Sequence, residues 1–182
     1  MKIYETERLI IREWEIKDYQ DLYEYASLDE VTKYLSWPTY TDIEQAKTRI
    51  ESLIIKYTED INTHDYAIEL KAEEKVIGSI GIVEFSPKAE GVAEIGYVLN
   101  PRFQGNGYMT EALKGMFVYI KKNQIAKRIV LRHDVENVKS GNVMKRAGMV
   151  FEGIIRKAGH KNNVRSRYDL AQYSILDEEI EL

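Results

Sequence analysis

The chain has 182 residues, with 44% hydrophobic and 31% charged side chains and a formal net charge of −4. This composition is typical of a globular protein with a sizeable core and excludes a largely disordered chain. The acidic balance argues against a general nucleic-acid binder, which carries a basic face, and the absence of cysteine excludes disulfides, thiolate metal sites and a cysteine nucleophile.

The first ten residues, MKIYETERLI, are charged and contain no long apolar stretch, so they do not read as a signal peptide. No later run approaches the roughly 18 consecutive apolar residues that a membrane helix requires. We therefore expect a soluble cytoplasmic protein that neither spans a membrane nor binds nucleic acid.

The first third of the chain predicts one strand and then three helices. RLIIREW alternates as in a strand, and the segments after it carry apolar residues at helical spacing. Thr41 to Glu44 resemble a capping box, and the apolar stripe behind it ends at Tyr57. The expected elements are a strand over 8–14 and helices over 16–27, 29–35 and 43–57.

Strands predominate in the rest of the chain. DYAIEL, KVIGSIGIVEF and VAEIGYVL favour three strands, and after Gly107 apolar residues recur on one face of a helix from Met109 to Ile120. A further strand, a short helix closed by Gly148 and two more strands follow. The expected boundaries are strands over 65–70, 75–85, 92–99, 128–134, 149–158 and 166–176, and a short helix over 139–147.

The order of these elements contains no repeat, low-complexity tract or linker. It therefore predicts a single α+β domain over residues 1–182. We expect a mixed, mostly antiparallel sheet of six to seven strands that is flanked by helices.

The segment LNPRFQGNGYMTEALKGMFVYI joins a strand to a helix through a turn with two glycines. Gly105 and Gly107 permit positive φ and close approach of a ligand, and the helix supplies free N–H groups. Together these features suit an anion, most naturally phosphates, although an ordinary turn with glycines for tight packing has the same sequence. A P-loop and a dinucleotide fingerprint are excluded, because Gly-Tyr-Met-Thr replaces Gly-Lys-Ser/Thr and Thr110 replaces the third glycine.

With the strand before it, this turn resembles the acetyl-CoA-binding core of the GNAT acyltransferases, whose R/Q-x-x-G-x-G/A pattern is matched by Arg102, Gly105 and Gly107. The resemblance extends over nearly the whole chain. ETERLIIREWEIKDYQDL resembles the opening of the RimJ/RimL branch, which modifies protein N-terminal amines. NVKSGNVMKRAGMVFEGIIRKA resembles the N-x-x-S helix of that branch and the strand after it, and RYDLAQYSIL resembles its closing strand.

The resemblance implies a splayed sheet, with acetyl-CoA in the V between the strand that ends at Leu99 and the strand that begins near Arg128. Pantetheine would pair, as an added strand, with the backbone of the strand that ends at Leu99. The pyrophosphate would bind the N–H groups of residues 104–109. The cofactor-binding residues that the resemblance implies are Tyr97, Val98, Leu99, Arg102, Gln104, Gly105, Asn106, Gly107, Tyr108, Met109, Asn137 and Ser140.

The reaction requires a general base, because amines are mostly protonated at neutral pH. In the enzymes that this chain resembles, a glutamate at the position of Glu94 often serves as this base. The alternative to a catalytic role is that Glu94 is a strand residue paired with a cation at the surface. Asn137 is expected to contact pantetheine and Ser140 to protonate the leaving thiolate, although both residue types also cap helices. Some relatives carry an acidic residue where this chain has AGHKNN, so a base at that place is lacking in this sequence. If Glu94 is not the base, His160 and Asp134 are the next candidates.

Trp37, which precedes Pro38 in a loop, is the expected substrate contact, whereas Tyr34 suits core packing. The loops expected to select the acceptor are 37–42, 86–91 and 158–167. The three histidines are scattered along the sequence, so no metal site is expected.

The resemblance therefore predicts an N-acetyltransferase that moves acetyl from acetyl-CoA to a primary amine by direct attack in a ternary complex. The acceptor is a protein N-terminal α-amine or a small-molecule amine, and a homodimer is compatible with this prediction. Without cysteine, a thiol relay is excluded. Two alternatives remain: a non-catalytic acyl-CoA-binding sensor or regulatory module, and an assembly protein whose groove is vestigial.

Overall fold

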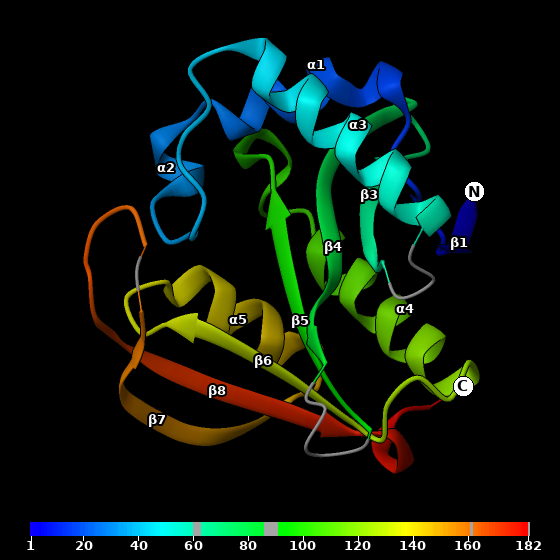
Figure 1. Cartoon of the computed structure of the whole chain (residues 1–182). Coiled ribbons are helices and arrows are strands. Elements are labelled where there is room, and N and C mark those ends of the chain that lie inside the picture. Colours follow the sequence, from blue (N-terminus) through cyan, green and yellow to red (C-terminus); the bar gives the residue numbers. More distant parts are fainter. Residues whose placement is uncertain (60–62, 86–90, 161, 182) are drawn as a thin grey trace.

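The computed structural model describes residues 1–59, 63–85, 91–160 and 162–181. They form an eight-stranded sheet in the order β1-β2-β3-β4-β5-β6-β8-β7 (Figure 1). Neighbouring strands are antiparallel except β5 and β6, which are parallel, so the expected α+β fold with a mixed, mostly antiparallel sheet is confirmed. The strands are β1 (Lys2–Glu5), β2 (Leu9–Arg12), β3 (Asp65–Leu70), β4 (Lys75–Phe85), β5 (Val92–Leu99), β6 (Arg128–Asp134), β7 (Val150–Gly159) and β8 (Tyr168–Leu176).

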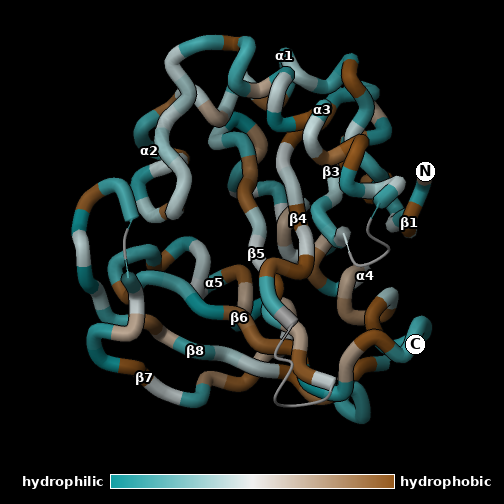
Figure 2. Tube along the Cα trace, in the orientation of Figure 1, coloured by the Kyte–Doolittle hydropathy of each residue, from teal (hydrophilic) through white to brown (hydrophobic). Residues whose placement is uncertain are grey.

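Helices flank both faces of the sheet. In the described part of the chain the α-helices are α1 (Tyr19–Ala26), α2 (Asp29–Thr32), α3 (Ile43–Glu59), α4 (Tyr108–Lys122) and α5 (Val138–Arg146). Helices α1 and α3 share a core with Trp14 and Ala67, whereas the predicted apolar stripe of α4 is buried in a second core on the opposite face. Figure 2 shows hydrophobic segments along the central strands and α4, and mostly hydrophilic connecting loops.

The sheet has one strand more than the sequence pattern predicts. The additional strand is β1, which the pattern misses because the strand is short and only partly buried. It pairs with β2 through Lys2 and Arg12. Tyr4 Oη in β1 donates a hydrogen bond to Ala112 O of α4 at 2.7 Å, across 108 residues of sequence. A contact over this separation leaves no periodic signal in the four residues of the strand.

The start of α3 differs in detail from the predicted capping box. Asp42 caps the helix in place of Thr41, because Asp42 Oδ1 accepts a hydrogen bond from the Glu44 N–H at 2.9 Å. Gln45 supplies the reciprocal contact, and its Oε1 accepts from the N–H groups of Thr41 at 2.7 Å and Asp42 at 3.1 Å. The predicted Thr41–Glu44 pair is therefore wrong by one residue at each position, although the helix begins at Ile43 as expected.

The sheet divides between β5 and β6. These strands share three register pairs, the last of which joins Glu94 and Val130. Strand β4 stays paired with β5 as far as Leu99, and β8 stays paired with β6 as far as Asp134. The two parallel strands therefore splay into a V, with its apex at Glu94 and its open end at Leu99 and Asp134 (Figure 1).

A buried ion-pair cluster fastens the segment before α1 to the sheet. Arg12 is 7% exposed and donates to both carboxylate oxygens of Asp18, at 2.7 and 2.9 Å. Arg12 Nε donates to Glu69 of β3 at 2.6 Å. Asp18 is 3% exposed and also accepts from the Glu15 N–H at 2.8 Å. The cluster therefore joins β2, β3 and the entrance to α1.

We expect Asp18→Ala to lower the free energy of unfolding by about 3–5 kcal/mol, because the buried guanidinium of Arg12 would lose its bidentate partner. Urea unfolding followed by circular dichroism measures this loss. The matched control is Asp177→Ala, since the Lys127 side chain of that ion pair is 75% exposed. Exposed pairs contribute about 0–1 kcal/mol, so equal losses in the two variants would contradict the role of burial.

Candidate active site

The glycine turn lies at the open end of the V, between β5 and α4 (Figure 1). Gly105 and Gly107 both adopt positive φ, of 84° and 79°. A Cβ on Gly105 would meet no described atom within 4 Å, and a Cβ on Gly107 would lie 3.6 Å from Arg8 Nη2. A Cβ on Gly115 of α4, by contrast, would lie 2.5 Å from the Tyr4 ring. Tight packing therefore explains Gly115 but not the two glycines of the turn.

The turn is followed by a row of unpaired backbone donors. The first hydrogen bond of α4 runs from the Glu111 N–H to Gly107 O at 3.0 Å. The N–H groups of residues 105–109 donate to no residue that the structure describes. Gln104 does not belong to this row, because its N–H donates to Pro101 O at 3.2 Å. The unpaired N–H groups therefore begin one residue after Gln104, the first expected donor, and coincide with the positive end of the helix dipole.

Charged side chains at the rim of the turn are held by neighbouring helices. Arg102 Nη1 donates to Glu24 Oε1 of α1 at 2.8 Å, and the Arg102 side chain is 72% exposed. A hydrogen bond from Lys75, together with the one from Arg102, lowers the pKa of Glu24 to about 2. Gln104 Oε1 accepts a hydrogen bond from Lys139 Nζ of α5 at 3.0 Å. Arg102 is therefore paired with Glu24, whereas Lys139 contacts the turn through Gln104.

The side chains of β5 alternate between two faces of the sheet. Val98 packs against the core of α1 and α3, and Tyr97 packs against the core of α4. Because successive strand residues point to opposite faces, Glu94 lies on the same face as Val98, here named the α1 face. The opposite face, with Tyr97, is named the α4 face. Beyond Glu94, the edge of β5 toward β6 has no strand partner in the described chain, so an extended ligand can pair there.

Ser140 lies on the α4 face, beside Tyr97. The two hydroxyl oxygens are 3.0 Å apart, and Tyr97 Oη is also 3.0 Å from Ser140 O. Burial raises the pKa of Tyr97, so its phenol stays protonated at neutral pH. Asn137 caps α5, since its Oδ1 accepts from the Ser140 N–H at 3.4 Å. The structure therefore brings together Tyr97, Asn137 and Ser140, with Asn137 in a capping role and its amide nitrogen left for other contacts.

Glu94 lies at the apex of the V on the α1 face and is ion-paired. Both of its carboxylate oxygens accept hydrogen bonds from Arg132 of β6. Glu84, opposite Glu94 in the β4–β5 register, lies 3.6 Å from the same guanidinium. The Glu94 side chain is 20% exposed. This pair is the structural alternative to a catalytic role, and a base role requires a proton donor to reach a remaining lone pair of Glu94.

Three segments that are distant in sequence border the α2 side of the V. Trp37 is half-buried in the connection between α2 and α3. Asn163, after β7, donates from Nδ2 to Thr32 O and Trp37 O, both at 2.8 Å. Arg165 Nη1 donates to Glu136 Oε1 at 2.7 Å, beyond the end of β6. The loop after β7 therefore joins α2 to the end of β6, whereas residues 86–90 of another expected acceptor loop lie outside the described chain.

Asp134, a reserve candidate for the base, has a fully buried side chain. Its Oδ2 accepts from Asn162 Nδ2 and its Oδ1 accepts from the Glu136 N–H, both at 3.0 Å. These bonds anchor the loop after β7 at the end of β6. His160, the other reserve candidate, is exposed. Sequence reasoning does not find Asn162, because its role arises from pairing across 28 residues rather than from local spacing.

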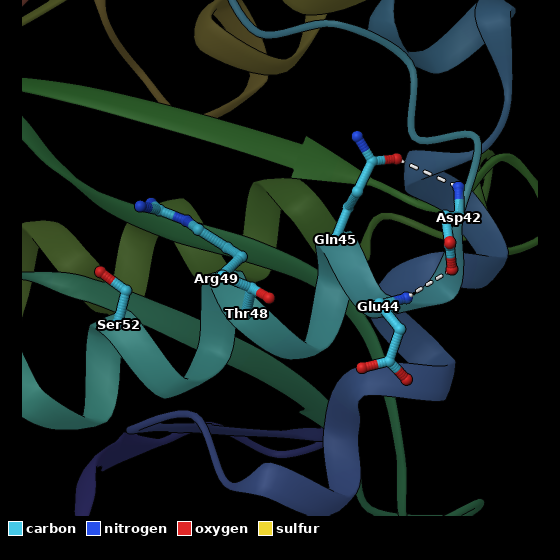
Figure 3. A pocket seen from close by; sticks show the side chains of 6 residues that line it. All are labelled: Asp42, Glu44, Gln45, Thr48, Arg49 and Ser52. Carbon is cyan, nitrogen blue, oxygen red and sulfur yellow. Dashed lines mark hydrogen bonds between the residues drawn. The ribbon is translucent and has the colours of Figure 1, made fainter.

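A shallow hollow lies along α3 and shares no residue with the V (Figure 3). Asp42 and Gln45 in its lining form the cap of α3, and Arg49 forms an ion pair with Asp65 at 2.5 Å. The polar groups of the hollow thus stabilise α3 and its contact with β3, and we assign them no part in the reaction. The lining residues are Asp42, Glu44, Gln45, Thr48, Arg49 and Ser52.

Among the residues that the structure describes, no group of three or more His, Cys, Asp or Glu side chains is arranged to hold a metal ion. None of their helices combines the length and the hydropathy needed to cross a membrane.

Known proteins match this chain over most of its length. The family model described as an acetyltransferase (GNAT) domain matches residues 8–150. An uncharacterized N-acetyltransferase of Bacillus subtilis, YnaD, is 36% identical over 174 residues, which cover 96% of each chain. The ribosomal-protein-serine acetyltransferase of Escherichia coli is 26% identical over 132 residues, which cover 71% of this chain and 70% of that protein.

A solved structure supports the same assignment. The microcin C7 self-immunity acetyltransferase MccE, determined in complex with acetyl-CoA and AMP, superposes with a TM-score of 0.81 at 25% identity. The match covers 94% of this chain and 93% of the chain in that structure. Because the family model spans well over half of the chain, this protein belongs to the GNAT family and is an acetyl-CoA-dependent N-acetyltransferase.

Proposed function

We propose that this enzyme transfers the acetyl group of acetyl-CoA to a primary amine by direct attack in a ternary complex. The observation that carries the proposal is the V between β5 and β6, whose open end meets the free N–H groups of residues 105–109. A strand edge beside such a cluster suits a ligand with amides along one part and phosphates along another. Acetyl-CoA has this arrangement.

In this proposal the pantetheine arm pairs with the backbone of residues 97–99, and the pyrophosphate binds the N–H groups of residues 105–109. Arg102 and Gln104 lie at the rim of the phosphate site, and Asn137 faces the arm with its amide nitrogen. An arm that enters at the turn and follows β5 brings the thioester toward the apex of the V. Glu94 lies at that apex.

The acceptor amine must lose a proton before or during its attack on the thioester carbonyl. Glu94 takes this proton, directly or through a water molecule, while the backbone N–H near Val98 polarises the carbonyl. The C–N bond forms and the C–S bond breaks. The leaving thiolate takes a proton from Ser140, which solvent then reprotonates, or from solvent directly.

The α1 face favours a cationic acceptor. Glu84 and Glu94 share one cation, Arg132, so this part of the face carries an excess of negative charge that attracts an ammonium group. Trp37 supplies an apolar contact on the α2 side. A protein N-terminal α-amine and a small-molecule amine both satisfy this chemistry, and the likeness to a ribosomal-protein-serine acetyltransferase supports the first.

We expect acetyl-CoA to stabilise the protein against thermal unfolding, and NAD and ATP to leave it unchanged. The donors of the turn suit a pyrophosphate, but both nucleotide fingerprints are absent from the sequence. Ligand at about 100 times its dissociation constant adds about 2.7 kcal/mol to the free energy of unfolding. Differential scanning fluorimetry measures the shift, and equal shifts with all three ligands would contradict the cofactor placement.

Release of free CoA thiol tests the reaction itself. The enzyme is incubated with acetyl-CoA and a panel of N-terminal peptides, polyamines, amino acids and aminoglycosides. With one class of amine, we expect CoA thiol to be released at a rate that depends on the amine. A protein that binds acetyl-CoA tightly, yet releases no thiol with any amine, would instead match the acyl-CoA sensor.

A further inference from the structure

Arg8 lies in the connection between β1 and β2, yet its side chain reaches the glycine turn. Its Nη1 donates to Asn106 O at 3.0 Å. Its Nε and Nη2 both lie 2.6 Å from Glu111 Oε2 in the first turn of α4. The guanidinium carbon lies 4.5 Å from the centroid of the Tyr108 ring. One side chain therefore contacts the turn, the residue after it and the helix that it begins.

Glu111 holds Arg8 in this position. Glu111 Oε1 accepts hydrogen bonds from Thr6 Oγ1 at 2.5 Å and from the Arg8 backbone N–H at 2.9 Å. The Glu111 side chain is 18% exposed, whereas the Arg8 side chain is 42% exposed. The carboxylate thus anchors both the backbone and the side chain of Arg8, and it leaves Nη1 of the guanidinium to contact the turn.

The contact with Asn106 O fixes a peptide plane. Asn106 O and the Gly107 N–H belong to one trans peptide group, in which C=O and N–H point in opposite directions. While Arg8 holds the oxygen, the Gly107 N–H points away from Arg8, toward the opposite side of the turn. Gly105 and Gly107 give this segment unusual backbone freedom. Asn106 Nδ2 donates to Phe103 O and Gln104 O at 3.3 Å within the turn, and Arg8 adds a contact from outside the turn that favours one orientation of the peptide.

Arg8 also balances the charge of Glu111. The carboxylate lies in the first turn of α4, whose amino-terminal end is the proposed phosphate site. A carboxylate without a cation at this point would repel a bound pyrophosphate. The ion pair removes this repulsion and leaves the dipole of α4 to attract the phosphates.

From these contacts we propose that Arg8 is a positioning residue for the acetyl donor, because it orients the Gly107 N–H toward the pyrophosphate and neutralises Glu111. This inference rests on the proposed placement of acetyl-CoA. It adds a residue from outside the glycine motif, and it assigns Arg8 to donor affinity rather than to the chemical step.

The test compares Arg8→Ala with the wild-type enzyme by isothermal titration and steady-state kinetics. We expect the Kd and KM for acetyl-CoA to rise by about 10–100-fold, as for a lost hydrogen bond to a charged group, while kcat at saturation stays near wild type. S-acetylpantetheine lacks phosphates, so its kcat/KM should not change. Arg8→Lys keeps the charge without the planar fork and should give an intermediate Kd, which decides the matter if the alanine variant does not fold.

Arg128→Ala is the matched control. Arg128 pairs with Glu152 at 2.6 Å and is 33% exposed, so its loss should lower stability to a similar degree without changing the Kd. An unchanged Kd in folded Arg8→Ala, an equal rise in Arg128→Ala, or an equal loss with S-acetylpantetheine would overturn the role of Arg8. A wild-type enzyme that does not bind acetyl-CoA would instead overturn the cofactor placement itself.

Discussion

Replacing Gly105 by valine should weaken acetyl-CoA binding by about 100-fold or more, as expected when two charge-assisted hydrogen bonds are lost. Gly105 adopts a φ of 84°, and no described atom lies within 4 Å of the place that a Cβ would occupy. The valine side chain would therefore project into open space over the turn, where the proposed pyrophosphate approaches the backbone. Isothermal titration with acetyl-CoA measures the loss.

Gly148→Val separates this effect from backbone strain. Gly148 follows α5, has a φ of 93°, and also has no described atom within 4 Å of its Cβ position. Both variants should lose about 1–2 kcal/mol of stability, because a non-glycine residue is strained at positive φ. Only Gly105→Val should also lose affinity for acetyl-CoA. Normal binding by folded Gly105→Val would show that the turn is purely structural.

Elements with a long local period could be predicted from the sequence. The stripe of α4 and the alternation in β5 are repeated within one element, and the structure places both as expected. The short helix expected over 29–35 ends at Thr32, and β1 has no pattern to detect, because four-residue elements are defined mainly by their tertiary partners. Boundaries and short elements therefore depend on contacts that local sequence does not encode.

The residues of the candidate site also differ in whether the sequence alone predicts them. Gly105 and Gly107 could be predicted because positive φ restricts the residue type at the position itself. Arg8 contacts Glu111 across 103 residues, and Asn163 contacts Trp37 across 126 residues, so neither pairing has a local signal. The pairing of Glu94 also has no local signal, because Arg132 becomes its neighbour only through the β5–β6 register.

The side chains of β5 alternate between the two faces of the sheet, and the proposed base and the proposed acid therefore lie on opposite faces. Glu94 belongs to the α1 face, whereas Ser140 meets Tyr97 on the α4 face. A thioester at the apex of the V would thus have the proposed base on one side and the proposed acid on the other. Amine and leaving thiolate would then exchange protons with different groups.

Glu94→Gln should lower turnover by about 10²–10⁴-fold at pH 7 while the Kd for acetyl-CoA stays near wild type. Glutamine keeps the shape of the side chain but cannot accept a proton at neutral pH. The rate of the variant should climb with pH, because solvent then deprotonates the amine, near pH 7.7–8.0 for an α-amine and near 10.4 for a lysine. Steady-state rates of thiol release from pH 6 to pH 10 measure this profile.

The matched control is Glu84→Gln, which removes the other carboxylate beside Arg132 from a side chain that is 65% exposed. If Glu94 acts only through the charge of the ion pair, the two variants should lose activity to a similar degree and keep the pH profile of the wild type. If Glu94 is the base, only its variant becomes strongly pH-dependent. A normal rate for Glu94→Gln at pH 7 would move the base elsewhere, and loss of acetyl-CoA binding would show that its pair with Arg132 holds the apex of the V together.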